Sequence, residues 1–226
     1  MTNRLSLGRA IALATAVVAF ASTPAAAQRA QAVELTAFAG GYWGSTIYQG
    51  PLPTPGGPIT TVGVNSSGLY GARLGYVIQR QFGVEFSWSA SDPTLNFGSG
   101  FNTYGTKGNM SVNNFDFDAM FNFGQQRIWG YLGLGLGWSE YSASITDNTG
   151  PVATKSQSYF SGNTALGMKA FINPHIAFRL DWRYRWSNTN HQTSAGVGCV
   201  YYCYAYSSTW YGASELTGGL TYVFFK

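Results

Sequence analysis

The sequence has little charge and no long hydrophobic run. Only 10 % of its 226 residues are Asp, Glu, Lys or Arg, although 16 % are aromatic. The longest apolar stretch, Ala10 to Ala21, has twelve residues, whereas a transmembrane helix needs about 20. A protein that crosses a membrane with helices is therefore excluded, and the low charge without helical stretches favours β-strands.

Cysteine is also scarce, because Cys199 and Cys203 are the two in the chain. No second pair of ligands accompanies them, so the spacing does not indicate a zinc site. In an oxidising compartment a local disulfide between them is favoured over two free thiols. We expect neither a cofactor nor a bound metal.

The N-terminal residues indicate which compartment this is. Arg4 and Arg9 precede the apolar run, and an Ala-x-Ala sequence ends at Ala27. A basic start, a short apolar centre and small residues at the end are typical of a secretory signal peptide. We expect residues 1–27 to be a signal peptide, cleaved near Ala27 after Sec-type export, and residues 28–226 to form one domain.

The basic residues do not indicate a nucleic-acid partner. The chain has 13 Lys and Arg against 9 Asp and Glu. Without Arg4 and Arg9 of the expected signal peptide, 11 basic residues remain, so the net charge of the mature chain is about +2. This excess is too small to argue for binding to nucleic acid.

Residues 159–186 alternate between two kinds of side chain with period two, which predicts a β-hairpin around the turn Asn173-Pro174-His175. After the turn, one face is apolar from Ile176 to Trp186 and the other is charged from Arg179 to Arg185. A lipid-facing side with an aromatic belt and an enclosed polar interior explain both faces.

The same alternation recurs along the chain. We expect strands at 33–43, 68–78, 82–90, 112–123, 128–138, 159–172, 176–186 and 210–225. The beginning of the fourth, near Val112, breaks the alternation and predicts a bulge. Short turns near positions 80, 126 and 174 alternate with long loops at 45–67, 92–107, 142–157 and 188–208. This pattern predicts an all-β, eight-stranded antiparallel up-and-down transmembrane barrel with long extracellular loops.

Charged residues fix which face of each strand points inward. A basic residue on the lipid face costs about 2–4 kcal/mol at mid-depth, out of the roughly 5–15 kcal/mol that stabilise a protein. Some thirty bulky side chains, by contrast, would not fit inside eight strands. We therefore expect eleven charged side chains in the lumen: Glu34, Arg73, Glu85, Asp116, Asp118, Lys169, Arg179, Asp181, Arg183, Arg185 and Glu215.

The chain resembles the OmpA-like family of small eight-stranded outer-membrane β-barrels of Gram-negative bacteria. The cleavage site at Ala27, the glycine-alternating run Tyr131–Trp138 and the stretch from Leu166 to Trp182 around the Asn-Pro turn carry the resemblance, which covers residues 28–226. It implies a location in the cell outer membrane, contact with outer-membrane lipid and lipopolysaccharide, and insertion by the barrel assembly machinery.

Two motifs resemble those of enzymes or nucleotide sites. The run Gly133-Leu134-Gly135-Leu136-Gly137 is similar to a phosphate-binding loop, but its third glycine comes one residue early and no helix follows. Glycines that make room inside a narrow barrel are the better interpretation. Trp186-Ser187-Asn188 is similar to the His-x-Ser-Asn motif of lipid A deacylases, but Arg185 occupies the histidine position and cannot act as a general base.

The lumen charges allow two hypotheses. A structural network of ion pairs that fills the lumen is favoured, since buried charges must be paired. A narrow ion pathway is the alternative, suggested by the successive inward arginines Arg179, Arg183 and Arg185.

Any further function depends on the long loops. They contain Tyr48, Tyr104, Tyr201, Tyr202, Tyr204 and Tyr206 with few charges, which suits contact with an extracellular protein or a host surface. We expect a non-enzymatic outer-membrane protein with a structural or surface-interaction role. The alternatives are a porin-like channel for ions or small solutes and, less favoured, a lipid A-modifying enzyme.

Overall fold

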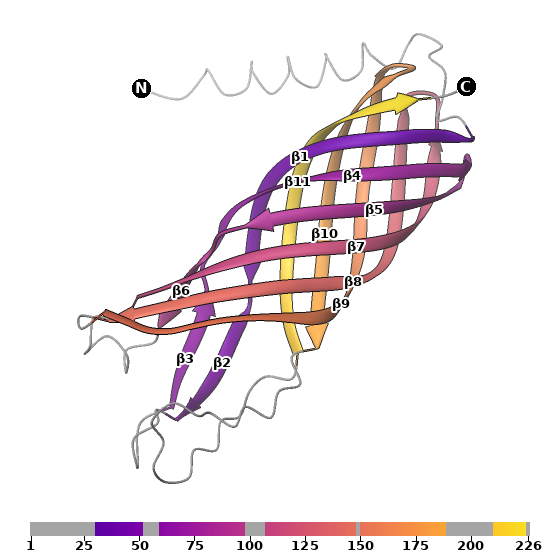
Figure 1. Ribbon diagram of the computed structural model, residues 1–226. Coiled ribbons are helices and arrows are strands. Elements are labelled where there is room, and N and C mark those ends of the chain that lie inside the picture. Colours follow the sequence, from indigo (N-terminus) through magenta and orange to yellow (C-terminus); the bar gives the residue numbers. More distant parts are fainter. Residues whose placement is uncertain (1–29, 52–58, 98–106, 148–149, 189–209, 225–226) are drawn as a thin grey trace, which may run out of the picture.

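The computed structural model describes residues 30–51, 59–97, 107–147, 150–188 and 210–224. The expected signal peptide, both cysteines, and Tyr104 and Tyr201–Tyr206 of the loop tyrosines lie outside these ranges. No helix within them is long and apolar enough to cross a membrane. The described residues form eleven strands (Figure 1): β1 Ala32–Gly44, β2 Thr46–Pro51, β3 Ile59–Val64, β4 Ser67–Gln79, β5 Phe82–Ser91, β6 Thr94–Phe97, β7 Lys107–Gln125, β8 Ile128–Asp147, β9 Gly150–Asn173, β10 Ile176–Asn188 and β11 Trp210–Phe224.

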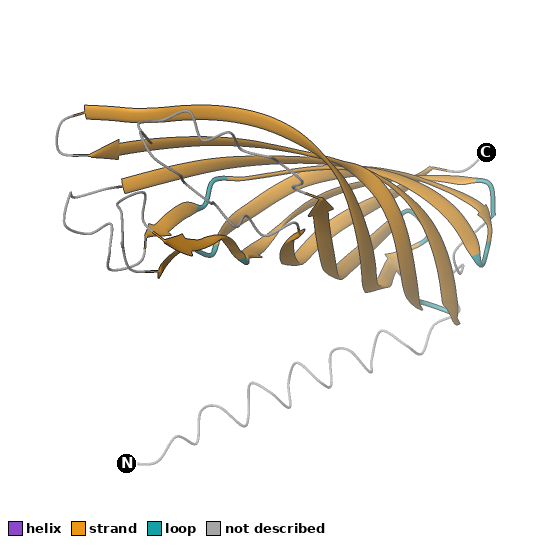
Figure 2. Cartoon of the chain, turned by 90° about the horizontal axis from the view of Figure 1, so that it is seen from below, coloured by secondary structure: helices purple, strands orange, loops and turns teal. Residues whose placement is uncertain are grey.

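Eight of these strands close a barrel. Antiparallel pairs run in the order β1, β4, β5, β7, β8, β9, β10 and β11, and β11 then pairs with β1. The closing pair extends from Val33 opposite Phe224 to Gly44 opposite Ala213. Figure 2 shows the long strands twisting together along the wall. Closure pairs the backbone groups of each strand on both sides, which a membrane interior requires. The predicted eight-stranded antiparallel barrel is confirmed.

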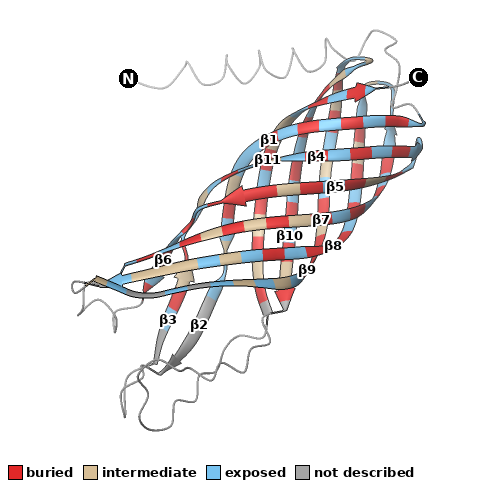
Figure 3. Cartoon of the chain, viewed as in Figure 1, coloured by how far each residue is buried: buried red, intermediate tan, exposed pale blue. Residues whose placement is uncertain are grey.

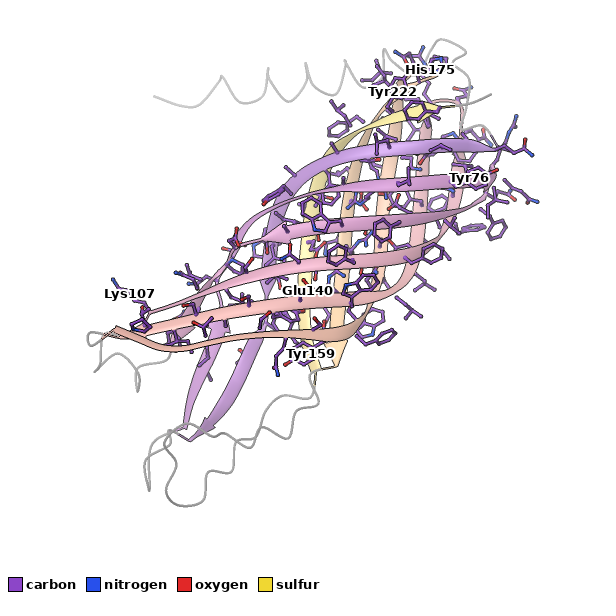
Figure 4. All side chains as sticks on the ribbon, viewed as in Figure 1. Tyr76, Lys107, Glu140, Tyr159, His175 and Tyr222 are labelled. Atoms are coloured by element: carbon purple, nitrogen blue, oxygen red, sulfur yellow. The ribbon has the colours of Figure 1, made fainter. Side chains whose placement is uncertain are left out.

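The two ends of the barrel differ. Two-residue turns join β4 to β5, β7 to β8 and β9 to β10 at one end, where Figure 4 places His175 and Tyr222. At the other end β7, β8 and β9 continue far beyond the rest of the wall, and Lys107 marks this end in Figure 4. Since short turns face the periplasm in such barrels, the end at Lys107 faces the outside of the cell.

Burial alternates along the wall strands (Figure 3) and separates apolar from charged side chains. Phe117 is 60 % exposed and Trp182 is 46 % exposed on the outside of the barrel. Their neighbours Asp118 and Arg183 have relative exposures of 0 % and 1 %. Burying charge in the lumen and leaving aromatic rings exposed suits lipid outside the wall, and it would be unfavourable in water.

Three of the four expected long loops contain strands, which corrects the sequence interpretation. β2 and β3 lie within 45–67, β6 lies within 92–107, and β8 and β9 extend through most of 142–157. Outside the membrane the outward face of a strand need not be apolar, so the contrast between its two faces weakens. The Pro and Gly residues of these segments therefore indicated loops in the sequence, although β-branched runs such as Ile59–Val64 favour strands.

The predicted bulge near Val112 is wrong. β7 pairs with β8 without a register shift from Lys107 to Gln125, and Val112 is buried like the inward residues before and after it. The alternation of polar and apolar residues is interrupted in the sequence because Val112 and Met110 are inward but apolar. They belong to an apolar cluster at the extracellular end of the barrel.

Candidate functional site in the barrel lumen

The structure places all eleven charged side chains inside the barrel, each 3 % exposed or less. They come from β1, β4, β5, β7, β9, β10 and β11, because the inward positions of these strands alternate with lipid-facing positions. β10 contributes four of them in succession: Arg179, Asp181, Arg183 and Arg185. The candidate site is the network that these residues form.

Arg183 lies at the middle of the network. Its guanidinium is 3.0 Å from a carboxylate oxygen of Asp116 and 2.8 Å from one of Asp118, with Glu85 at 3.7 Å. Arg183 also donates a hydrogen bond of 3.1 Å to the Ser87 hydroxyl. One cation from β10 thereby connects two carboxylates of β7 with one of β5.

Towards the periplasm, Asp181 lies between two arginines. Its carboxylate is 2.6 Å from Arg73 and 2.8 Å from Arg179. Arg179 also pairs with both oxygens of Glu85 and donates a hydrogen bond of 2.7 Å to the Tyr131 hydroxyl. Each buried charge here has an opposite charge beside it, which offsets the cost of removing it from water.

Further pairs lie on either side of this centre. On the extracellular side Arg185 pairs with Asp116 and lies 3.2 Å from Glu215. On the periplasmic side Lys169 and Glu34 form a pair of their own at 2.5 Å. The ion pairs thus form a column along the lumen, from Glu34 and Lys169 to Glu215 and Arg185.

β8 contributes glycines where its neighbours contribute charges. A side chain at Gly135 would overlap the Asp118 carboxylate and come within 2.6 Å of the Asn163 amide nitrogen, and one at Gly137 would come within 2.7 Å of the Asp116 carboxylate. The glycine run therefore makes room for the network, as the sequence interpretation preferred. The glycine run does not have the conformation of a phosphate-binding loop, since it lies within a continuous strand.

An apolar cluster closes each end of the column. At the periplasmic end it consists of Ala32, Val77, Trp129, Phe171, Ala177 and Val223. At the extracellular end it consists of Phe38, Tyr42, Val62, Val64, Leu69, Leu95, Phe97, Met110, Val112, Tyr211 and Ala213. The hydroxyls of Tyr42 and Tyr211 share a hydrogen bond of 2.7 Å within this extracellular cluster, and Phe38 extends from it to the charge network. The lumen residues that the structure describes thus form a paired, charged centre between two apolar ends.

Two residues of the deacylase-like motif, Arg185 and Ser187, face the lumen and have partners there. Arg185 is bound to Asp116 and Glu215, and the buried Ser187 hydroxyl shares a hydrogen bond of 3.0 Å with Tyr141. Burial raises the pKa of the Tyr141 hydroxyl, which lies beyond the lipid-facing aromatic rings, so it stays protonated. Among the described residues, no group of three or more His, Cys, Asp or Glu could hold a metal ion.

The sequence interpretation missed two aromatic partners of the network. Tyr131 accepts the hydrogen bond from Arg179, and the Phe38 ring lies 3.8 Å from the Arg73 guanidinium carbon. Both occupy inward positions of their strands, so the period-two pattern could have identified them. The sequence interpretation assigned neither of them to a face of its strand.

The closed wall, the lipid-facing aromatic rings and the charged lumen define a small transmembrane β-barrel of the outer membrane. Among known families, the one described as "Outer membrane protein beta-barrel domain" matches residues 12–224. The chain belongs to this family, and its location is the cell outer membrane. No curated protein matches the chain in sequence.

Solved structures of outer-membrane proteins have the same fold. The outer membrane protein OprG from Pseudomonas aeruginosa matches with a TM-score of 0.57 at 14 % identity, over 88 % of this chain and 99 % of that one. AlkL, solved in lipid bilayers, matches with a TM-score of 0.52 at 15 % identity, over 91 % and 95 %. Neisserial surface protein A matches with 0.51 at 15 % identity, over 84 % and 97 %. At such identities the likeness concerns the fold alone.

Proposed function

We propose that the protein is a non-enzymatic outer-membrane barrel that presents an interaction surface to the outside of the cell. The surface is the extension, which we define as β2, β3 and β6 with residues 107–113 of β7, 140–147 of β8 and 150–158 of β9. The observation that carries the proposal is that these strands form one continuous sheet beyond the barrel wall.

The extension packs on the barrel through the extracellular apolar cluster, which makes it a firm surface. Val62 and Val64 of β3, Leu95 of β6 and Met110 of β7 are all at most 8 % exposed in the extracellular cluster. Burying one such side chain stabilises a fold by roughly 1.5–3 kcal/mol. Several of them together favour an ordered sheet over separate loops.

One edge of the extension suits recognition of another polypeptide. Residues 151–158 of β9 pair with β8 on one side, whereas the pairing of β9 with β10 begins only at Ser161. No described strand lies against the other side of residues 151–158, and Thr154, Ser156 and Ser158 are exposed there. A strand edge with polar side chains can add an extended segment of a partner through backbone hydrogen bonds.

The lumen favours this function over the two alternatives. A channel needs a hydrated path, and the described lumen is occupied by ion pairs between two apolar clusters. A lipid A deacylase needs a general base beside its serine, and the position two residues before Ser187 is Arg185, held by two carboxylates. Export by the signal peptide at residues 1–27, insertion by the barrel assembly machinery and contact with lipopolysaccharide belong to the same proposal.

Shortening the β8–β9 hairpin tests the proposal. Replacing residues 145–153 by a two-residue turn removes part of the edge and keeps Tyr141 and Ala143, which pack on the cluster. We expect bacteria with this variant to lose adherence to epithelial-cell monolayers, while the barrel keeps its heat-sensitive migration on gels. A control with Thr154→Ala and Ser156→Ala keeps the backbone edge and should adhere normally.

Equal adherence of bacteria with the shortened variant, the wild type and no barrel at all would contradict the proposal. Single-channel recordings in planar bilayers separate it from the pore alternative. We expect no conductance at high protein loading, and steady unitary currents would favour the channel.

A further inference from the structure

A groove runs along β11 on the outer wall of the barrel. The outward positions of β11 there are Gly212 and Ser214, which have small side chains. Trp43 of β1 lies opposite Ser214 on one side, and Tyr184 and Trp186 of β10 lie opposite Ser214 and Gly212 on the other. Aromatic side chains on both sides of these small residues therefore border an open groove of about 320 Å³. We call it the β11 groove.

The floor of the β11 groove is polar but uncharged. The Gly212 amide donates a hydrogen bond of 3.2 Å to the Ser45 hydroxyl, and Ser214 also lines the floor. The Tyr184 hydroxyl comes over Gly212, where an added side chain would approach it to 2.6 Å. The lining residues include no charged side chain that faces outward. A neutral ligand with hydroxyl or amide groups fits this floor better than a bare phosphate or ammonium group, which needs an opposite charge.

The depth of the groove indicates which part of the membrane fills it. The next outward residue of β11 towards the barrel middle is Leu216, opposite Trp182, so the apolar wall begins there. Trp43 and Tyr184 are exposed at the extracellular limit of that wall, where interfacial aromatic rings meet lipid headgroups. The groove therefore faces the outer leaflet at headgroup depth.

A second hollow shares Trp186 with the groove and is apolar. Phe117, Ala119, Leu134 and Leu136 contribute its outward side chains, and it encloses about 370 Å³. The Trp186 ring extends over β9, because a side chain at Gly162 would meet it at 2.6 Å. A ligand that extends past Trp186 would therefore place a polar group in the groove and an apolar chain in the hollow.

We propose that the β11 groove binds the glucosamine saccharide of lipid A, with one of its acyl chains in the hollow beyond Trp186. The sugar ring presents C–H groups to the aromatic walls and hydroxyl or amide groups to Ser45, Ser214 and Tyr184, while its phosphate groups stay in the hydrated headgroup layer outside the uncharged floor. The outer leaflet of the outer membrane supplies lipid A, and its joined sugar and acyl groups match the two hollows. This inference rests on the lipopolysaccharide contact of the proposed function, which it places at one site, and it does not depend on the extension or its partner.

Competition between lipids tests the proposal. The full chain is reconstituted in nanodiscs with equal amounts of lipid A and phosphatidylglycerol, and native mass spectrometry measures the ratio of the two bound lipids. We expect the wild type to retain lipid A in preference. Ser214→Leu fills the floor and should lower the ratio about tenfold, which corresponds to a loss of about 1.4 kcal/mol. Ser214→Ala removes only the hydroxyl and should lower the ratio less.

Ala72→Leu is the matched control. It places a leucine at another outward position of the wall, on β4 opposite Ala37 and Trp88, away from both hollows, and should keep the wild-type ratio. Heat-sensitive migration on gels establishes that each variant is folded, and Ser214→Ala decides the test if Ser214→Leu does not fold. Equal retention of the two lipids by the wild type would overturn the proposal. So would an equal effect of Ala72→Leu and Ser214→Leu, or an unchanged ratio in both folded Ser214 variants.

Discussion

The barrel wall and the extension share strands, yet their two faces have opposite polarity. Along β7, Asp118 points inward and Phe117 points outward within the membrane. Further along the same strand, Met110 points inward and Asn109 points outward. The inner and outer faces exchange character where the medium outside the wall changes from lipid to water. One β-strand can therefore follow two rules, because the solvent on its outer face decides which side chains are favoured there.

Breaking the charge network should have the largest effect. Arg183→Met leaves Asp118 buried without a cation beside it, whereas Asp116 keeps its ion pair with Arg185. We expect the free energy of unfolding, measured in urea from lipid vesicles, to fall by about 3–5 kcal/mol. The double variant Arg183→Met with Asp118→Leu leaves no unpaired carboxylate on β7 and should recover part of the loss. A double variant less stable than Arg183→Met would contradict the pairing.

Placing the same charge on the outer face of each region sharpens the comparison. Phe117→Arg puts a guanidinium against lipid and should cost about 2–4 kcal/mol of unfolding free energy. Asn109→Arg puts it on the same face of the same strand in water and should change that energy by at most about 0.5 kcal/mol. Equal losses would mean that the two positions share one environment.

Adding a methyl group separates the filled lumen from the open extension and should have the smallest effect. Gly135→Ala overlaps the Asp118 carboxylate and should cost about 1–3 kcal/mol. Gly63→Ala in β3 meets nothing within 4 Å and should be neutral within about 0.5 kcal/mol. Thermal unfolding in the same lipid measures both, and a neutral Gly135→Ala would show that the lumen has spare room.

The wall was predictable from the sequence because lipid sharpens the period-two pattern. Trp182 beside Arg183 and Phe117 beside Asp118 leave one orientation for each strand, so the inward positions of the eleven charges follow. Their partners do not follow, because the pairing of Arg183 with Asp116 and Asp118 depends on how β10 and β7 face each other across the lumen.

The extension was not predictable for the opposite reason. Beyond the membrane, outward residues such as Asn109 and Ser111 are polar and inward residues such as Val112 are apolar. In the wall, apolar residues point outward and polar residues inward. Interpreted with that pattern, the reversal resembles a bulge next to a loop. Tyr131 and Phe38 show the same limit inside the wall, since an aromatic ring beside an arginine can serve the lumen as well as lipid.

Nitroxide accessibility tests most directly whether lipid covers the aromatic face of the wall. Spin labels are placed singly at Phe117 and Asn109, in a chain with Cys199→Ser and Cys203→Ser, and the protein is reconstituted in lipid bilayers. The label at 117 should collide mainly with oxygen, which concentrates in lipid, and the label at 109 mainly with a water-soluble nickel complex. A label at 117 that meets the nickel complex as readily as the label at 109 would contradict the inside-out arrangement of the barrel.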